Sequence, residues 1–238
     1  MTPKIEKTLD FLNQSFDVSE YWKKNPAGKN YRFDHTIRVA KYAAQIAENE
    51  NMDRESLVIA ALLHDVSYGL DFDIKKSFTY KEPCPELENC THDDLIKYHG
   101  YISVLHSKAF LENLGYEGEK LDDMLGAISH TASPDGAKYC VKDTTFCRTI
   151  GDADEIDHVS AFRFYEDLRD FDFSNASMQD RQQFIWNTKG YTEHCMNGIY
   201  QVLKTETARK LYKENCDFRF KVLDELQGLV DNSKVEGL

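Results

Sequence analysis

The dipeptide His64-Asp65 stands at the end of residues 56–63, the most apolar segment of the chain. Burying an imidazole and a carboxylate beside such a segment is unfavourable unless another group compensates both of them. Successive residues of a helix are about 100° apart, so both side chains can flank one point near the helix end. A divalent cation at that point would bind the carboxylate and the imidazole lone pair. The alternative is a His-Asp pair that caps its own helix end.

His35 lies at the start of the preceding predicted helix, residues 34–50, and a short turn at 51–53 joins that helix to the apolar segment. Antiparallel packing across such a turn brings the start of the first helix beside the end of the second. We therefore expect His35 and His64 at the same level of a helical bundle. Arg38 stands three residues after His35, on nearly the same helix face. We expect Arg38 to contact a substrate phosphate or to pair with a carboxylate.

Four carboxylates stand within residues 152–157, after a stretch that we expect to be buried. Asp152 lies one turn before Ile156 on the apolar side of the predicted helix, so it can point inward. We predict that Asp152 joins the two histidines and Asp65 as a metal ligand. Asp154 and Asp157 are expected to face water or to make caps.

Two further histidines, His99 and His130, lie on well-patterned predicted helices. A lone histidine on such a helix face is often only a satisfied core residue or a rim residue. Because these two lie between the stronger motifs, we predict that both are metal ligands. His106, two turns beyond His99 on the same face, is the main alternative to His99.

Helical periodicity is strong along the chain, whereas strand signals are weak. We expect a chain break at residues 26–28, a long connection at 68–91, a turn at 133–136 and a helix N-cap at Asp53. The predicted helices span residues 4–14, 34–50, 56–63, 93–113, 119–131, 144–168, 177–187, 191–203 and 205–228.

These helices predict an all-α fold with one domain over residues 1–238. Its metal-site core would span residues 30–165, and C-terminal helices at residues 177–228 would pack on that core. The hydrophobic content of 41% and a chain of 238 residues are sufficient for a sizeable core without disulfide bonds.

Composition restricts the partners and the compartment. The chain carries a formal net charge of −12 and has no run of Lys and Arg long enough to form a basic patch. Such a surface repels phosphate backbones, so a nucleic acid polymer is not expected as a partner. No segment approaches the length of a membrane span, and the N-terminus lacks the apolar core of a signal peptide. We therefore expect a soluble, cytoplasmic protein with no membrane partner.

The six cysteines form no C-x-x-C pair, so free thiols are the simplest expectation. A zinc clip of Cys84, Cys90 and His92 is the alternative, although its ligand spacing is loose. Helical surfaces rich in Phe and Tyr leave a homodimer open.

The order His … His-Asp … Asp, at His35, His64-Asp65 and Asp152, resembles the HD-domain metal-dependent phosphohydrolase superfamily. The likeness covers residues 30–165 and is greatest to small stand-alone members. It extends to the neighbouring residues in Asp34-His-Thr-Ile-Arg-Val39 and Ala61-Leu-Leu-His-Asp65. The loop after His130 and the region after residue 157 depart from the family pattern.

The resemblance implies an HD-domain helical bundle with additional C-terminal helices, and a function. The family hydrolyses phosphate esters or phosphoanhydrides with metal-activated water, so the implied substrate is a nucleotide or another small phosphorylated metabolite. The implied alternatives are an HD-type di-iron oxygenase and a nucleotide-binding HD module without catalytic activity.

The resemblance also implies roles for individual residues. The first ion would be held by His35, His64, Asp65 and Asp152. Asp65 would bridge to a second ion completed by His99 and His130, and the choice between one ion and two stays open. Mixed nitrogen and oxygen ligands favour Mn, Fe, Co, Ni or Zn over Mg. Asp65 and Arg38 are the candidate catalytic residues.

Overall fold

The computed structural model describes residues 1–18, 23–24, 26–69, 92–129 and 144–232. Within these residues the regular structure is helical throughout and contains no strand, which confirms the all-α prediction. His130, the turn at 133–136 and most of the connection at 68–91 lie outside the described residues. Their predictions are therefore not tested.

The chain divides into two compact units, Met1–Asp154 and Glu155–Leu238. The prediction of one domain over residues 1–238, with C-terminal helices packed on its core, stays a prediction. The helices that follow are α1 (Pro3–Val18), α3 (Pro26–Asn49), α4 (Arg54–Leu63), η1 (Val66–Gly69), α6 (His92–Asn113), α7 (Gly118–Ser129), α9 (Thr145–His158), α10 (Ala161–Asp170), α11 (Met178–Asn197), α12 (Ile199–Val202) and α13 (Glu206–Asn232).

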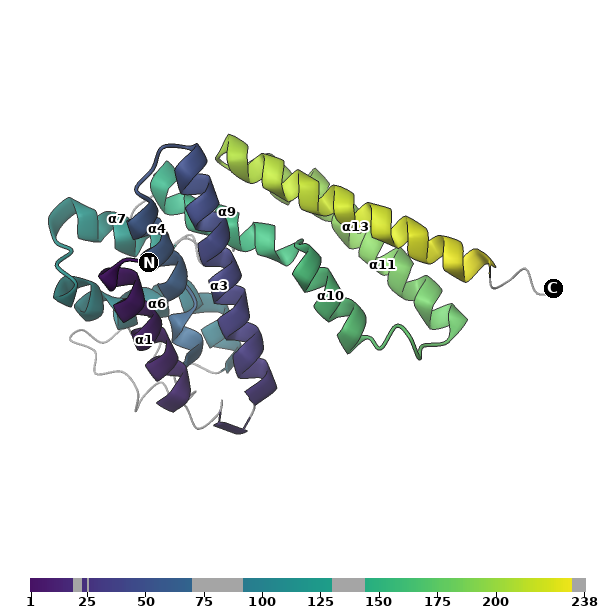
Figure 1. Cartoon of the computed structure of the whole chain (residues 1–238), viewed down its shortest axis with the longest axis horizontal. Helices are drawn as coiled ribbons and strands as arrows, with labels where there is room; N and C mark the ends of the chain where they lie inside the picture. The colour runs from purple at the N-terminus through teal and green to yellow at the C-terminus, as the bar shows by residue number, and fades with distance from the viewer. Residues whose placement is uncertain (19–22, 25, 70–91, 130–143, 233–238) are drawn as a thin grey trace. The chain divides into compact units, whose positions relative to one another are not determined.

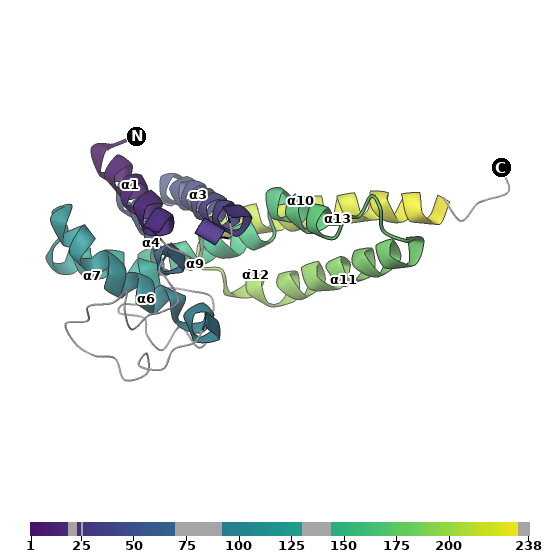
Figure 2. The ribbon, with the colours of Figure 1, turned by 90° about the horizontal axis from the view of Figure 1, so that it is seen from below.

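Helix α4 is the centre of the first unit. Every residue from Ser56 to Leu63 is buried, as the continuous apolar pattern predicts. α4 packs against α1, α3 and α7, while α6 packs against α7 and η1 (Figures 1 and 2). Asp53 caps the helix by accepting hydrogen bonds from the backbone N–H and the hydroxyl of Ser56, at 3.1 and 2.9 Å. The predicted N-cap is confirmed.

Helix α3 is longer than predicted. It begins at Pro26 and shows no break at residues 26–28, because proline is well tolerated in the first turn of a helix. His35 therefore lies within α3 rather than at its start. α3 extends well past the shorter α4 (Figure 1). The end of α4 still lies beside the part of α3 that carries His35, because the ring centroids of His35 and His64 are 5.5 Å apart.

Two more helix boundaries differ from prediction. The expected helix at 144–168 is two helices, because Ser160 accepts a hydrogen bond from the backbone N–H of Arg163 at 3.1 Å and starts α10. The expected helices at 177–187 and 191–203 are instead continuous through Gly190 in α11, and α12 follows after Gly198. A single glycine weakens a helix but does not end it.

The second unit buries apolar side chains of α10, α11 and α13 against one another. Its core contains Phe164, Ile185, Leu223 and Val230. α11 and α13 lie side by side along most of their lengths (Figures 1 and 2). Arg219 of α13 is also buried, and its Nη2 donates to Asp167 Oδ2 of α10 at 2.8 Å.

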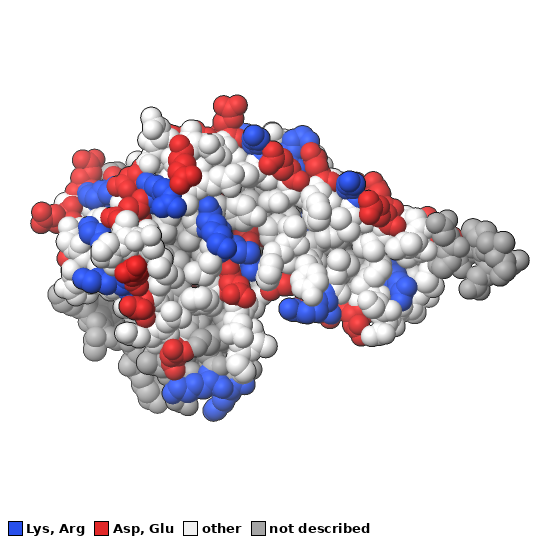
Figure 3. Space-filling view, in the orientation of Figure 1, with Lys and Arg blue, Asp and Glu red and all other residues white. Residues whose placement is uncertain are grey.

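The charged side chains of the surface are mixed in sign. On the face drawn in Figure 3, basic and acidic residues are interspersed and form no extended basic area among the described residues. This agrees with the expectation that a nucleic acid polymer is not a partner, which stays a prediction. No described helix has the length and apolar character needed to cross a membrane.

Candidate metal centre

Three buried or nearly buried side chains of the first unit converge at the end of α4. They are His35 of α3, His64 directly after α4 and Asp154 of α9. His35 Nε2 lies 3.1 Å and His64 Nε2 lies 3.9 Å from Asp154 Oδ1, and the three ligand atoms all lie within 4.8 Å of one another. Two donors bound to one ion at about 2.1 Å lie about 3.0–3.5 Å apart. The group can therefore hold a metal ion.

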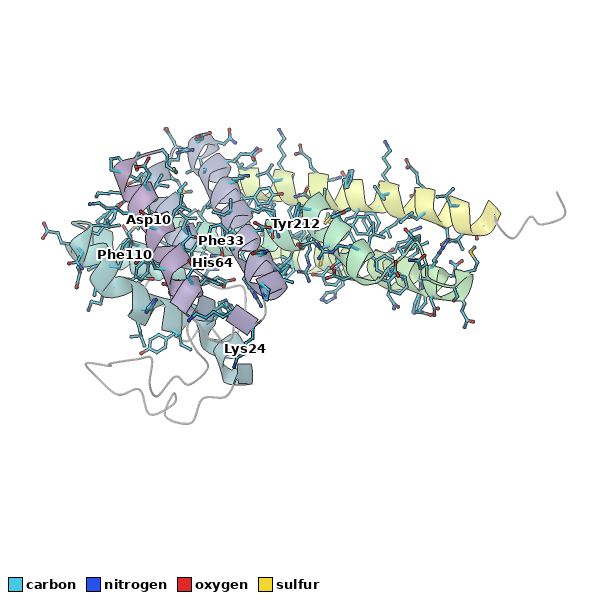
Figure 4. The ribbon with its side chains drawn as sticks, turned by 60° about the horizontal axis from the view of Figure 1, so that its bottom comes forward. Asp10, Lys24, Phe33, His64, Phe110 and Tyr212 are labelled. Atoms are coloured by element: carbon cyan, nitrogen blue, oxygen red, sulfur yellow. The ribbon has the colours of Figure 1, made fainter. Side chains whose placement is uncertain are left out.

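His64 is held in the orientation that a metal ligand needs. Its Nδ1 lies 2.6 Å from the carbonyl oxygen of Ala61, which can only accept, so Nδ1 carries the proton. The lone pair is then on Nε2, on the side of His35 and Asp154. Figure 4 shows His64 among the helices of the first unit. Nε2 is buried and makes no hydrogen bond with the described residues. A buried nitrogen left in this way is unfavourable, and a cation would satisfy it.

Asp65 lies between the histidines. Its Oδ1 is 3.6 Å from His64 Nε2 and 3.5 Å from His99 Nε2, while its Oδ2 is 3.5 Å from His35 Nε2 and 3.6 Å from Arg32 Nη1. Burial alone would raise the pKa of Asp65, but His64, His99, His35 and Arg32 together hold this pKa below its ordinary value. The carboxylate therefore stays ionised. Its two oxygens face different histidines, which is the arrangement of a bridging ligand.

The structure brings Asp154, not Asp152, next to the two histidines. The expectation that Asp154 faces water is wrong, since its side chain is 14% exposed and contacts His35. Asp152 is buried elsewhere on α9, and its role as a ligand stays a prediction. Hydrophobic periodicity could not separate these two aspartates, because α9 buries residues on more than one face, including Ile150, Asp152, Ala153 and Asp157.

Arg32 is the basic residue that the sequence analysis missed. Arg32 precedes His35 by three residues, and Arg38 follows His35 by three residues. Both arginines therefore lie on nearly the same face of α3 as His35. Its guanidinium lies 4.0 Å from the ring of Tyr68, which is buried. Arg38 is half-buried, and its contact with a phosphate stays a prediction.

The other histidines and the cysteines are placed as follows. His99 reaches Asp65, whereas His106 faces α1, with Nε2 3.4 Å from Ser15 Oγ and its ring stacked on Phe11. Burial lowers the pKa of His106. Among the described cysteines, those at 147, 195 and 216 are buried free thiols, as predicted. The cysteines of the alternative zinc clip, 84 and 90, lie outside the described residues.

Comparison with known families identifies the domain that contains this group. The model of the HD domain matches residues 32–158, just over half of the 238 residues. The chain belongs to the HD domain family. The resemblance inferred from His35, His64-Asp65 and Asp152 is thereby confirmed at the level of the family, and so is the all-α fold. The matched range contains His35, His64 and Asp154, and it also contains Arg32.

The HD domain and the helices that follow it are similar to a solved structure. That structure is a crystal structure of a predicted HD superfamily hydrolase from an uncultured Thermotogales bacterium, 18% identical to this chain. The match covers 95% of this chain and 92% of that chain, with a TM-score of 0.57. At this identity the likeness shows a shared fold, which extends beyond the HD domain into the C-terminal helices. No curated protein matches the sequence.

Proposed function

We propose that this HD domain protein is a metal-dependent hydrolase of phosphate esters or phosphoanhydrides in small substrates such as nucleotides. The observation that carries the proposal is the convergence of His35 Nε2, His64 Nε2 and the Asp154 carboxylate within 4.8 Å of one another. Membership of the HD domain family supports it. The fold shared with a predicted HD superfamily hydrolase is consistent with it.

The donor set fits a divalent transition metal. His35, His64 and Asp154 would hold one ion, and Asp65 lies close enough to the same histidines to join them. Two imidazole nitrogens with carboxylate oxygens favour Mn, Fe, Co, Ni or Zn over Mg. A second ion would use Asp65 with His99, for which His130 remains the predicted ligand.

A divalent ion supplies hydroxide at neutral pH by lowering the pKa of a bound water, and it neutralises charge on phosphoryl oxygens. The protein's own contribution is position and charge. Ala61 fixes the His64 ring through its carbonyl oxygen, so Nε2 needs no reorientation. If Asp65 held the ion through one oxygen, its other oxygen would be the proton acceptor for a nearby water. Arg32 and Arg38 are the candidate partners of substrate phosphate on α3.

The partners and the compartment are proposed from composition. A small phosphorylated substrate fits a chain of net charge −12 better than a nucleic acid polymer does, because close contacts at one site suffice to bind it. No membrane partner is proposed, the protein is proposed to be cytoplasmic, and a homodimer stays open.

The test is phosphate or pyrophosphate release from a panel of nucleotides and small phosphate esters, with and without Mn²⁺. We expect metal-dependent turnover that Asp65→Asn abolishes and that Asp170→Asn, at an exposed carboxylate of α10, leaves intact. An iron-loaded, coloured protein that consumes oxygen would instead support an oxygenase. Tight nucleotide binding without turnover under any metal would support a binding module, and either result refutes the proposal.

A further inference from the structure

Arg32 occupies a boundary between the buried metal centre and solvent. Its Nη1 lies 3.6 Å from Asp65 Oδ2, and the two side chains are 29% and 4% exposed. The guanidinium therefore faces a buried carboxylate on one side and solvent on the other. A planar guanidinium offers several N–H donors in a fork, so one part can pair with Asp65 while another remains available for an oxyanion.

Tyr68 holds this guanidinium in place. The ring of Tyr68 is 4% exposed, and the guanidinium carbon of Arg32 lies 4.0 Å from its centroid. Tyr68 in turn is tied to Asp65, because its backbone N–H donates to the Asp65 carbonyl oxygen at 3.0 Å. The backbone N–H of Ser67 donates to Ser103 Oγ of α6 at 3.1 Å and anchors the same turn. Arg32 is thus positioned by a turn that is hydrogen-bonded to α6.

Arg32 and a metal ion would compete for the same oxygen. Asp65 Oδ2 lies 3.6 Å from Arg32 Nη1 and 3.5 Å from Nε2 of His35, a candidate metal ligand. A cation bound by His35 and Asp65 would place its positive charge beside the guanidinium, and like charges at such distances repel. An anion between the cation and Arg32 would remove that repulsion.

We propose that Arg32 couples the two binding events of this centre: it neutralises Asp65 before metal binding and binds an oxyanion of the substrate afterwards. The inference rests on the proposed function, because it takes a phosphate-bearing substrate as the ligand. It makes metal binding and anion binding reinforce each other, because the anion removes the repulsion between the bound cation and the Arg32 guanidinium. By linkage, the factor by which metal strengthens anion binding equals the factor by which the anion strengthens metal binding.

The coupling predicts opposite effects of one substitution. Arg32→Gln removes the positive charge that competes for Asp65, so affinity for Mn²⁺ alone should rise by about three- to tenfold. The same change removes the guanidinium that binds the oxyanion. Affinity of the Mn²⁺-loaded protein for methylphosphonate, a phosphate analogue that cannot be hydrolysed, should fall by about tenfold or more. A merely structural arginine would weaken both or neither.

Calorimetric titration of the full chain with Mn²⁺ and with methylphosphonate tests this. Arg32→Lys keeps the charge but loses the fork, so Mn²⁺ affinity should stay near wild type while anion affinity falls. The matched control is Arg54→Gln, at an exposed arginine of α4 that pairs with Glu48, and it should change neither affinity. Circular dichroism at increasing temperature confirms that each variant is folded.

The coupling is overturned if Arg32→Gln weakens Mn²⁺ binding, or if it leaves methylphosphonate affinity within about twofold of wild type. Equal affinities for methylphosphonate with and without Mn²⁺ in the wild-type protein would overturn it as well. These results leave the proposed hydrolysis standing, because they concern the coupling between metal and anion binding and not metal binding itself. Wild-type protein that binds no Mn²⁺ at all would refute the proposed function and the coupling together.

Discussion

Replacing Asp154 by Asn should weaken metal binding far more than replacing Asp152 does. Asp154 Oδ1 lies 3.1 Å from His35 Nε2, so an ion on that nitrogen would be within a few ångströms of the carboxylate. At an effective dielectric constant of about 20, a divalent cation and a carboxylate 4 Å apart interact by about 8 kcal/mol. Asn keeps the shape and one oxygen, and the side chain is 14% exposed, so we discount the loss to about 2–3 kcal/mol.

That loss corresponds to a dissociation constant for Mn²⁺ that is about 30- to 150-fold higher in Asp154→Asn. Isothermal titration of metal-stripped protein measures it directly. Asp152→Asn is the matched control, because Asp152 is buried on the same helix but lies outside the converging group. Its dissociation constant should stay within about threefold of wild type. A larger effect at Asp152 than at Asp154 would refute the geometric reasoning and restore the ligand set predicted from sequence.

The remaining predictions concern stability. Gly69→Ala should destabilise the protein by about 1–3 kcal/mol in denaturant titration, because the added Cβ would lie 2.8 Å from the backbone carbon of Ser15. Gly190→Ala, with open space around its Cβ within α11, should be neutral or stabilise by up to about 1 kcal/mol, and equal destabilisation at both glycines would contradict this. Asp53→Ala should cost about 1 kcal/mol at pH 7 by loss of the N-cap of α4. Burial raises the pKa of Asp53, but Lys120 and Ser56 together bring this pKa below 3.8. The difference in the free energy of unfolding between Asp53→Ala and wild type should therefore shrink as pH falls below that value. A difference that does not change between pH 7 and 2 would refute the role of the ionised Asp53.

The pairing of His35 with His64 could be predicted from sequence because it depends on few unknowns. A short turn after α3 and an almost wholly apolar α4 require antiparallel packing, and this places both imidazoles at one level. The predicted start of α3 was wrong, but this did not affect the placement of His35 beside His64. The height of each histidine along the bundle depends on its distance from the turn and not on where the helix begins. The all-α fold followed from periodicity in the same way.

The third side chain of the converging group could not be predicted, because its position depends on the rotation of α9. Asp152 and Asp154 differ by about 200° around the helix, and residues on several faces of α9 are buried. The hydrophobic pattern of α9 therefore does not distinguish Asp152 from Asp154. His99 and His106 share a face but are two turns apart, so only the placement of α6 along the bundle decides which reaches Asp65.

Arg32 was missed for a related reason. It lies three residues before His35 and Arg38 lies three residues after, so helical spacing treats the two alike. The structure separates them through Tyr68, whose ring lies under the guanidinium of Arg32 after the turn that follows Asp65. That contact joins residues more than thirty positions apart, which spacing along one helix cannot reveal.

The most direct test of the central claim is an anomalous-scattering map from crystals of the protein grown with Mn²⁺. The account predicts a peak within about 2.0–2.3 Å of His35 Nε2, His64 Nε2 and a carboxylate oxygen of Asp154, with Asp65 as a further ligand or a bridge. A map that shows no Mn²⁺ between these side chains, in a protein that solution titration shows to be metal-loaded, would contradict it.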